Sequence, residues 1–244
     1  MTTTKRIVLI TGANKGIGYE TAKQLASAGH TVLIGARDPD KAAAAVASLT
    51  AEGHRAEAVT LDVLDAASIE RAVAHVAEHH GRLDTLINNA GLVAEAWGTP
   101  ASQTGLAAWR STFETNLFAV AAVTTAFLPL LKKSEAGRVV NLSSILGSLT
   151  LHADPTSWIY DFKTVAYDTS KAALNQYTIH LAHELKGTAI KVNAAHPGWV
   201  KTDLGGEGAQ MELVDGAKTS VWLATLPDDG PTGGYFHMQE RLPW

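Results

Sequence analysis

The sequence predicts a single α/β domain of the Rossmann type, with a doubly wound parallel sheet of about seven strands and helices on both faces. Short, continuously apolar runs such as residues 7–10 alternate with longer segments of helical periodicity. This alternation is typical of parallel strands that are covered on both faces. The 244 residues are enough for one such domain with its own core, but few for two.

The expected elements follow each other in regular alternation. A first strand at 7–10 leads through a glycine-rich turn into a helix over 17–28, which Gly29 ends. A second strand spans 31–34, and Asp38-Pro39-Asp40 opens an alanine-rich helix. The later elements are strand 56–61, helix 66–79, a strand ending at 86–87, helix 106–132, strand 138–142, helix 167–186, strand 190–194, helix 213–225 and a strand near 235–236.

Composition narrows the classes of function. A net charge of −4 gives no electrostatic support for a nucleic-acid or anionic-membrane partner. The absence of cysteine excludes a thiol nucleophile and a disulfide, and it suits the reducing cytoplasm in which we expect the protein. The longest apolar stretch, 119–131, is too short to span a bilayer. Because the first strand is expected from about Lys5, we expect no signal peptide.

The glycine-rich turn predicts a dinucleotide site. Gly12, Gly16 and Gly18 permit a tight turn and a close approach of the backbone to a pyrophosphate. The following helix N-terminus offers that group free N–H donors and a positive dipole end. Alone, the pattern would be read as an ordinary turn, but here it is the first turn of a doubly wound arrangement.

The end of the second strand indicates which dinucleotide binds. An NAD site usually carries an acidic residue there for the ribose 2′-hydroxyl, whereas this chain has Arg37, and Asp38 is expected to start the next helix. Arg37 and Lys15 can bind a 2′-phosphate, although both could be ordinary solvated cations. We therefore favour NADP(H). Asp62 and Val63 would lie beside adenine, and Asn89-Ala90-Gly91 against the ribose, with a purely structural turn role for the asparagines equally open.

Tyr167 and Lys171 are four residues apart in a helical segment and therefore share a face. A neighbouring ammonium lowers the pKa of a phenol from about 10, so Tyr167 could exchange a proton with a carbonyl or alcohol oxygen while hydride moves at the carbon. Ser143 and Ser144 bring hydroxyls to another strand end, where one of them could hold the carbonyl. Asn116 could anchor a water that links Lys171 to solvent, or cap a backbone group.

These motifs together resemble the short-chain dehydrogenase/reductase superfamily over essentially the whole chain, and within it the NADPH-dependent carbonyl reductases. The matching segments are Thr11-Gly12-x-x-x-Gly16-x-Gly18, Asn14-Lys15-Gly16-Ile17-Gly18, Ala36-Arg37-Asp38, Asn88-Asn89-Ala90-Gly91, Asn116, Ser144, Tyr167-x-x-x-Lys171 and Pro197-Gly198-Trp199-Val200-Lys201-Thr202-Asp203. The resemblance implies that Ser144 rather than Ser143 is catalytic, with Tyr167, Lys171 and Asn116. It also implies that Val200 and Thr202 contact the nicotinamide carboxamide and that hydride leaves the pro-S face.

The 23 positions from Ser144 to Tyr167 exceed those of compact family members and fall short of animal carbonyl reductases. We expect this segment at the mouth of the site, with Trp158 and Trp199 near the substrate. In the animal enzymes a larger insertion here leaves a monomer, so a monomer and a homo-oligomer both stay open. His75 and His79 have the spacing of a helical metal pair, but the sequence places no convincing third ligand beside them, and we expect no metal site.

The expected function is therefore NADPH-dependent reduction of small ketones or aldehydes. Residues 1–100 would mainly bind the cofactor, and residues 101–244 would mainly carry catalysis and substrate binding. The alternatives are an NADP-dependent secondary alcohol dehydrogenase, a 3-oxoacyl reductase and, from another class, a non-catalytic NADP-binding redox sensor.

Overall fold

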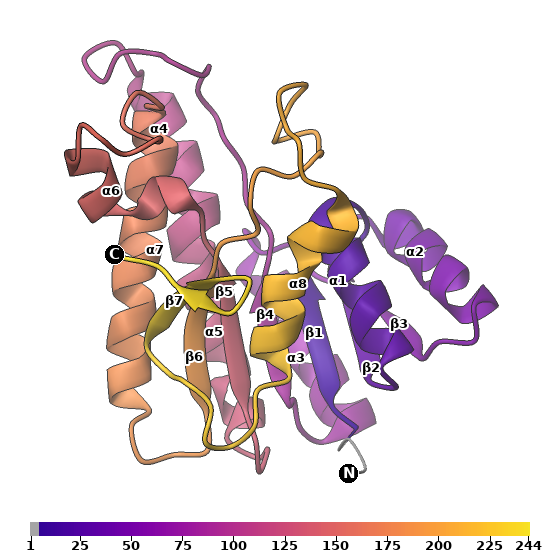
Figure 1. The fold of residues 1–244 in the computed structure, drawn as a ribbon. Helices are drawn as coiled ribbons and strands as arrows, with labels where there is room; N and C mark the ends of the chain where they lie inside the picture. The colour runs from indigo at the N-terminus through magenta and orange to yellow at the C-terminus, as the bar shows by residue number, and fades with distance from the viewer. Residues whose placement is uncertain (1–4) are drawn as a thin grey trace.

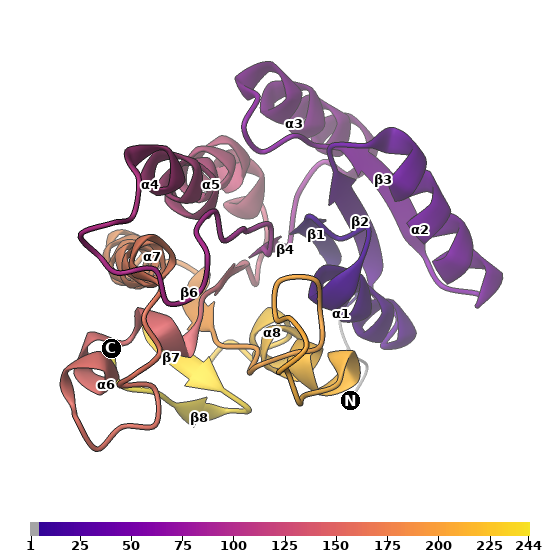
Figure 2. The same ribbon diagram turned by 90° about the horizontal axis from the view of Figure 1, so that it is seen from above.

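The computed structural model describes residues 5–244. Its strands form a single sheet in the order β3-β2-β1-β4-β5-β6-β7-β8, and helices cover both faces of it (Figures 1 and 2). Neighbouring strands are parallel except for the pair β7 and β8. The strands are β1 (Ile7–Thr11), β2 (Thr31–Ala36), β3 (Ala56–Thr60), β4 (Thr85–Asn88), β5 (Arg138–Leu142), β6 (Lys191–Ala195), β7 (Gly234–His237) and β8 (Glu240–Arg241).

The strand order reverses its direction between β1 and β4, as in a doubly wound sheet, and the predicted Rossmann-type fold is confirmed. The helices are α1 (Gly16–Ser27), α2 (Pro39–Ala51), α3 (Ala66–His80), α4 (Leu106–Phe113), α5 (Ala119–Leu131), α6 (Leu149–Ala153), α7 (Val165–Glu184) and α8 (Leu213–Ala224).

Two apolar cores lie on opposite faces of the sheet. One unites β1 and β2 side chains such as Ile10 and Ile34 with residues of α1, α2 and α8. The other unites Leu9 and Leu33 with residues of α3, α5 and α7. Successive side chains of a strand point to opposite faces, so the continuously apolar strands of the sequence supply both cores.

The expected helix over 106–132 is a compound element. Helices α4 and α5 are joined by a π-helical segment over Glu114–Phe118, and such segments are frequent at functional sites. By length and composition alone the whole run Leu106–Leu131 could cross a membrane, although half of its apolar window is buried inside the protein. Residues 106–118 are more polar than residues 119–131. The apolar stretch that the sequence shows is therefore only the C-terminal half of this run.

Among the α-helices and β-strands of the described residues, two were not predicted from the sequence. The short helix α6 lies in the segment between β5 and α7, and the two-residue strand β8 pairs with the end of β7. The chain end then lies against α6, because the amide of Thr150 donates to the carbonyl of Trp244 at 2.9 Å. Too few residues form either element for a periodic pattern to develop.

Buried amides connect the strands that carry the site. The amide of Asn88, at the end of β4, donates to Thr124 of α5 at 2.9 Å and to Asn141 of β5 at 2.8 Å. Asn141 in turn donates to Thr178 of α7 at 2.9 Å. This chain of hydrogen bonds fixes two strand ends against two helices, and it assigns Asn88 a structural role.

Candidate active site

The glycine-rich turn has the geometry that a pyrophosphate requires. Gly12 and Gly16 have φ of 65° and 61°, a region that side chains disfavour. A Cβ at Gly18 would lie 2.5 Å from the side-chain nitrogen Nδ2 of Asn89. At the N-cap of α1, Lys15 offers no side-chain acceptor, so the first-turn N–H groups can serve an anion. The residues present therefore fit a dinucleotide.

The segment after β4 holds this turn in place. The side-chain amide of Asn89 donates to the carbonyls of Thr11 at 2.8 Å and Gly12 at 3.2 Å. The hydroxyl of Thr11 accepts from the amides of Asn89 and Ala90, both at 3.0 Å. The side chain of Asn89 therefore stabilises the glycine-rich turn. This is the structural role that the sequence left open for Asn89.

The loop after β6 closes over the same turn. Gly198 has φ of 93°, and a Cβ there would meet the sulfur of Met211 at 2.5 Å. A Cβ on Gly16 would lie 3.9 Å from a methyl group of Thr202, and Lys15 pairs with Asp203. Thus Thr202, expected at the nicotinamide end, lies against the glycine-rich turn.

The side chain of His196, next to Pro197, connects this loop to the segment after β5 that carries Ser143 and Ser144. The buried imidazole of His196 accepts from the amide of Ile145 at 3.1 Å and from that of Gly198 at 3.4 Å. Burial lowers the pKa of His196 to about 3, with a smaller contribution from His237, so the ring is neutral and able to accept. Val200 is 3% exposed and packs on Gly216 of α8.

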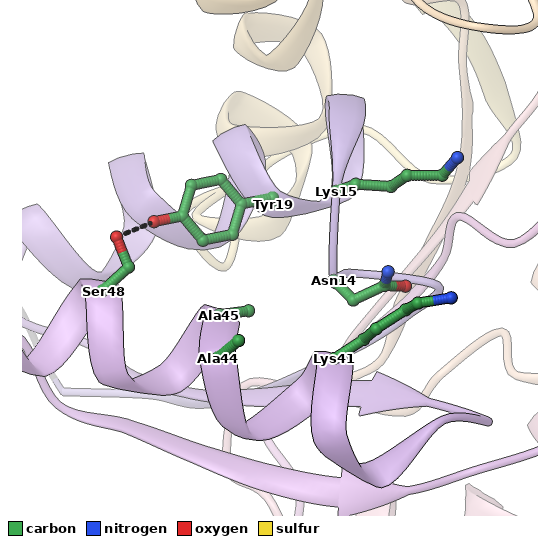
Figure 3. Close-up of a pocket in the computed structure, with 7 residues that line it drawn as sticks. All are labelled: Asn14, Lys15, Tyr19, Lys41, Ala44, Ala45 and Ser48. Carbon is green, nitrogen blue, oxygen red and sulfur yellow. Dashed lines mark hydrogen bonds between the residues drawn. The ribbon is translucent and has the colours of Figure 1, made fainter.

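The end of β2 and the start of α2 carry basic residues where a 2′-phosphate was expected, and one of them, Lys41, pairs with Asp38 at 3.2 Å. Asp38 accepts from the amides of Asp40 and Lys41 and caps α2, as predicted, so its carboxylate is engaged. Arg37 follows the last residue of β2 and is exposed. Asn14, Lys15 and Lys41 line an open pocket of about 460 Å³ between α1 and α2, with their polar ends toward the same side (Figure 3).

Lys41 was missed in the sequence, although a signal was present. It stands four residues after Arg37, in the first turn of the helix that Asp38 opens. Farther along the same edge, Val63 lines a narrow crevice with Thr11 and Ala90. The neighbouring carboxylate of Asp62 accepts from the amide of Leu64 at 3.0 Å, which shapes the turn after β3.

Tyr167 and Lys171 lie together on α7, with the ammonium 5.6 Å from the centroid of the phenol ring. They are 7% and 5% exposed. Burial raises the pKa of Tyr167 to about 12 despite an opposing effect of Ser144, and burial lowers the pKa of Lys171 to about 8. The sequence predicted a lowered phenol pKa, but in the ligand-free protein burial raises it and the ammonium of Lys171 does not offset this effect.

The two candidate serines have different surroundings. The hydroxyl of Ser143 is buried and donates to Asn175 at 2.6 Å. Ser144 is half-buried and lies close enough to Tyr167 to affect its pKa. A Cβ at Gly147 would lie 2.8 Å from the backbone of Lys171, so this glycine permits the serine loop to approach α7. The geometry favours Ser144 as the reactive serine.

Asn116 lies fully buried in the π-helical segment. Its side chain accepts from the amide of Leu92 and donates to the carbonyl of the same residue, both at 2.9 Å, and it also donates to Ser170 at 3.0 Å. A Cβ on Gly91 would lie 3.3 Å from its oxygen and 3.6 Å from the ammonium of Lys171. Asn116 therefore joins the segment after β4 to α7.

Aromatic side chains of the segment before α7 and of the loop after β6 contact one another. Trp158 meets Phe162, and Phe162 meets Trp199, each pair edge-on at 6.2 Å between centroids. Both tryptophans are exposed, at 64% and 45%. Trp97, which was not predicted from the sequence, contacts Tyr167, with 6.4 Å between the ring centroids. It stands in the loop after β4, whose course no periodic pattern predicts.

The histidines of α3 have a carboxylate partner, contrary to the expectation from the sequence. Glu57 of β3 binds His75 through one oxygen and His80 through the other, the latter at 2.9 Å. His79 instead bonds the carbonyl of His75. Over residues 5–244, no cluster of three or more ligating side chains has an arrangement suited to a metal ion.

Comparison with known proteins gives consistent relatives. The short chain dehydrogenase family model matches residues 6–213. A (+)-neomenthol dehydrogenase of Capsicum annuum is 32% identical over 98% of each chain, and carbonyl reductase [NADPH] 1 of Bos taurus is 32% identical over the whole of both. The crystal structure of an NADPH-bound carbonyl reductase from chicken fatty liver covers 98% of this chain and 99% of its own, with a TM-score of 0.85 and 30% identity.

The fold and the site define an oxidoreductase of the nicotinamide-dependent kind. The chain belongs to the short-chain dehydrogenase/reductase family.

Proposed function

We propose that this protein is an NADPH-dependent reductase that converts ketones or aldehydes to alcohols. The observation that carries the proposal is the joint placement of Tyr167, Lys171 and Ser144 beside a turn built for a dinucleotide. Bound NADPH supplies the hydride. The remaining steps belong to side chains of the protein.

Tyr167 supplies the proton. With a pKa of about 12, its phenol is protonated at neutral pH and can donate to the carbonyl oxygen. The phenolate that remains is stabilised by the ammonium of Lys171, which is mostly charged at neutral pH with a pKa of about 8. The hydroxyl of Ser144 holds the carbonyl oxygen, and Asn116 keeps the segment after β4 in position.

The choice of NADPH rests on charge. Lys15 and Lys41 line the open pocket between α1 and α2, where they pair with Asp203 and Asp38, and Arg37 is exposed at the end of β2. Asp38 is also used as a helix cap. Arg and Lys side chains bind phosphate oxygens by charge-assisted hydrogen bonds. The bovine and chicken relatives are named for NADPH, which supports the same cofactor here.

Oxidation of a secondary alcohol uses the same groups in reverse, and the pepper relative is named a dehydrogenase. A 3-oxoacyl substrate on an anionic carrier has less support. Near the mouth, Lys201 pairs with Glu212, and Lys163 bonds His152 and lies over the ring of Tyr160. An uncharged small molecule suits the exposed aromatic side chains better.

The test is loss of reduced-nicotinamide absorbance with NADPH, and separately with NADH, against aryl ketones, β-ketoesters, diketones and aldehydes. We expect turnover with a higher kcat/KM for NADPH. Equal or better use of NADH would contradict the cofactor assignment. Tight NADPH binding without turnover of any carbonyl would favour the redox-sensor alternative.

A further inference from the structure

The catalytic helix α7 is capped by a residue from a distant part of the chain. Its own N-cap residue, Thr164, makes no side-chain capping hydrogen bond. Instead Glu95, in the loop between β4 and α4, accepts from the backbone amide of Tyr167 at 2.8 Å. The bond ends at the residue whose side chain supplies the proton in the proposed reaction.

The carboxylate of Glu95 lies at the first turn of α7, where its charge acts on Asp168. Its second oxygen is buried without a partner, as are one oxygen of Asp168 and the hydroxyl of Thr164. The other oxygen of Asp168 accepts from the amide of Thr164 at 2.9 Å. Burial and the charge of Glu95 both raise the pKa of Asp168, to about 7.

With a pKa of about 7, Asp168 carries a proton in a large share of the molecules at neutral pH. A protonated carboxyl group can donate to a nearby oxygen, and so it relieves the repulsion between two buried carboxyl groups. The other ionisable groups that face Asp168 are Tyr167, whose pKa is raised by the charge of Asp168, His152 of α6, with its ring nitrogen 3.5 Å away, and Lys163. Lys163 bonds the ring of His152, and its charge lowers the pKa of Asp168. Burial lowers the pKa of His152, so it does not supply a fixed positive charge.

The loop that carries Glu95 is fixed at two points. At its start, Leu92 is held by Asn116 through two hydrogen bonds. Three residues later Glu95 bonds α7, and Trp97 follows with its ring against that of Tyr167. The backbone and the ring of Tyr167 are therefore both in contact with this one loop.

We propose that Glu95 is a positioning residue: it caps the catalytic helix at Tyr167 and holds the loop after β4 against the site. The inference rests on the proposed reductase function. It does not require Glu95 to touch the substrate. A shift of about 1 Å in a reacting group can cost about 100-fold in rate, so loss of this bond should lower the rate of the chemical step.

The test compares Glu95→Ala, which removes the acceptor, with Glu95→Gln, which keeps an oxygen at the same place. We expect Glu95→Ala to lower kcat by about 10- to 100-fold, with KM and the NADPH Kd within about twofold of wild type. Glu95→Gln should keep most of the activity. As a control, Asp65→Ala removes the cap of α3, where Asp65 accepts from Ala67 at 3.0 Å; it should lower stability and leave kcat unchanged.

A second readout does not depend on activity. Amide hydrogen exchange in the first turn of α7 should become faster in Glu95→Ala and stay near wild type in Glu95→Gln and Asp65→Ala. Unchanged exchange in Glu95→Ala, or equal loss of kcat in both Glu95 variants, would overturn the positioning role. Absence of turnover in the wild-type protein would instead contradict the reductase proposal, and the exchange experiment would still decide the cap.

Discussion

Replacing Lys171 with methionine should stabilise the ligand-free protein while it abolishes turnover. Lys171 is 5% exposed as a residue, and the one hydrogen bond of its ammonium among the described side-chain contacts is a donation to the carbonyl of Leu142 at 2.7 Å. Burial lowers its pKa from 10.5 to about 8. This difference corresponds to about 3 kcal/mol, by which the folded state disfavours the charged lysine at neutral pH.

The sign of the pH dependence follows from the same values. Because the folded-state pKa lies below the unfolded one, the unfolded chain binds more protons between about pH 8 and pH 10.5, and stability rises with pH across this window. The cost is therefore present in full below about pH 8 and is gone above about pH 10.5. Methionine loses the bond to Leu142, worth about 1 kcal/mol, which leaves a net gain of about 2 kcal/mol at pH 7.

The assay is urea unfolding of wild type and Lys171→Met, followed by tryptophan fluorescence at about pH 7 and about pH 9.5. The variant should be more stable at pH 7, and its advantage should shrink at the higher pH. Lys132→Met, which replaces an exposed lysine, should show no such gain. A variant less stable than wild type at pH 7, or an equal gain at both pH values, would refute the reasoning.

Three further changes test separate parts of the account. Tyr167→Phe should lower kcat by about 1000-fold, because the proton donor is lost, and leave the NADPH Kd within about twofold by fluorescence titration; Tyr160→Phe, at a tyrosine 37% exposed, should leave both unchanged. Arg37→Asp should reduce the NADPH-over-NADH ratio of kcat/KM by at least about tenfold, and an unchanged ratio would contradict the 2′-phosphate assignment. Asn88→Leu should lower the free energy of unfolding by about 2 kcal/mol, since Asn141 loses its donor, and a midpoint equal to wild type in urea would count against this.

The fold was predictable because its signals are long and repeated. Continuously apolar strands such as β1 and β2 alternate with helices, and this pattern specifies a parallel sheet. The glycine-rich turn and the pair Tyr167 and Lys171 were predictable for a similar reason, since each is a local motif at a strand end or on one helix face. Short elements such as α6 and β8 have no periodicity to reveal them.

What the sequence could not indicate depends on long-range contacts. Glu95 accepts a hydrogen bond from Tyr167, 72 positions away in the sequence. Glu57 of β3 contacts His75 and His80, which lie on α3. No local pattern brings such residues together. The pKa of Tyr167 is raised and not lowered for the same reason. Burial depends on every element packed around the ring, and not only on the neighbouring Lys171.

The most direct test of the central claim is transfer of a labelled hydride. The protein is incubated with a ketone from the panel and NADPH that carries deuterium at the pro-S position of nicotinamide C4, and the alcohol is examined by mass spectrometry. The account predicts deuterium on the carbinol carbon, and none when the label is pro-R. NADPH oxidation without label in the alcohol, or label only from the pro-R position, would contradict it.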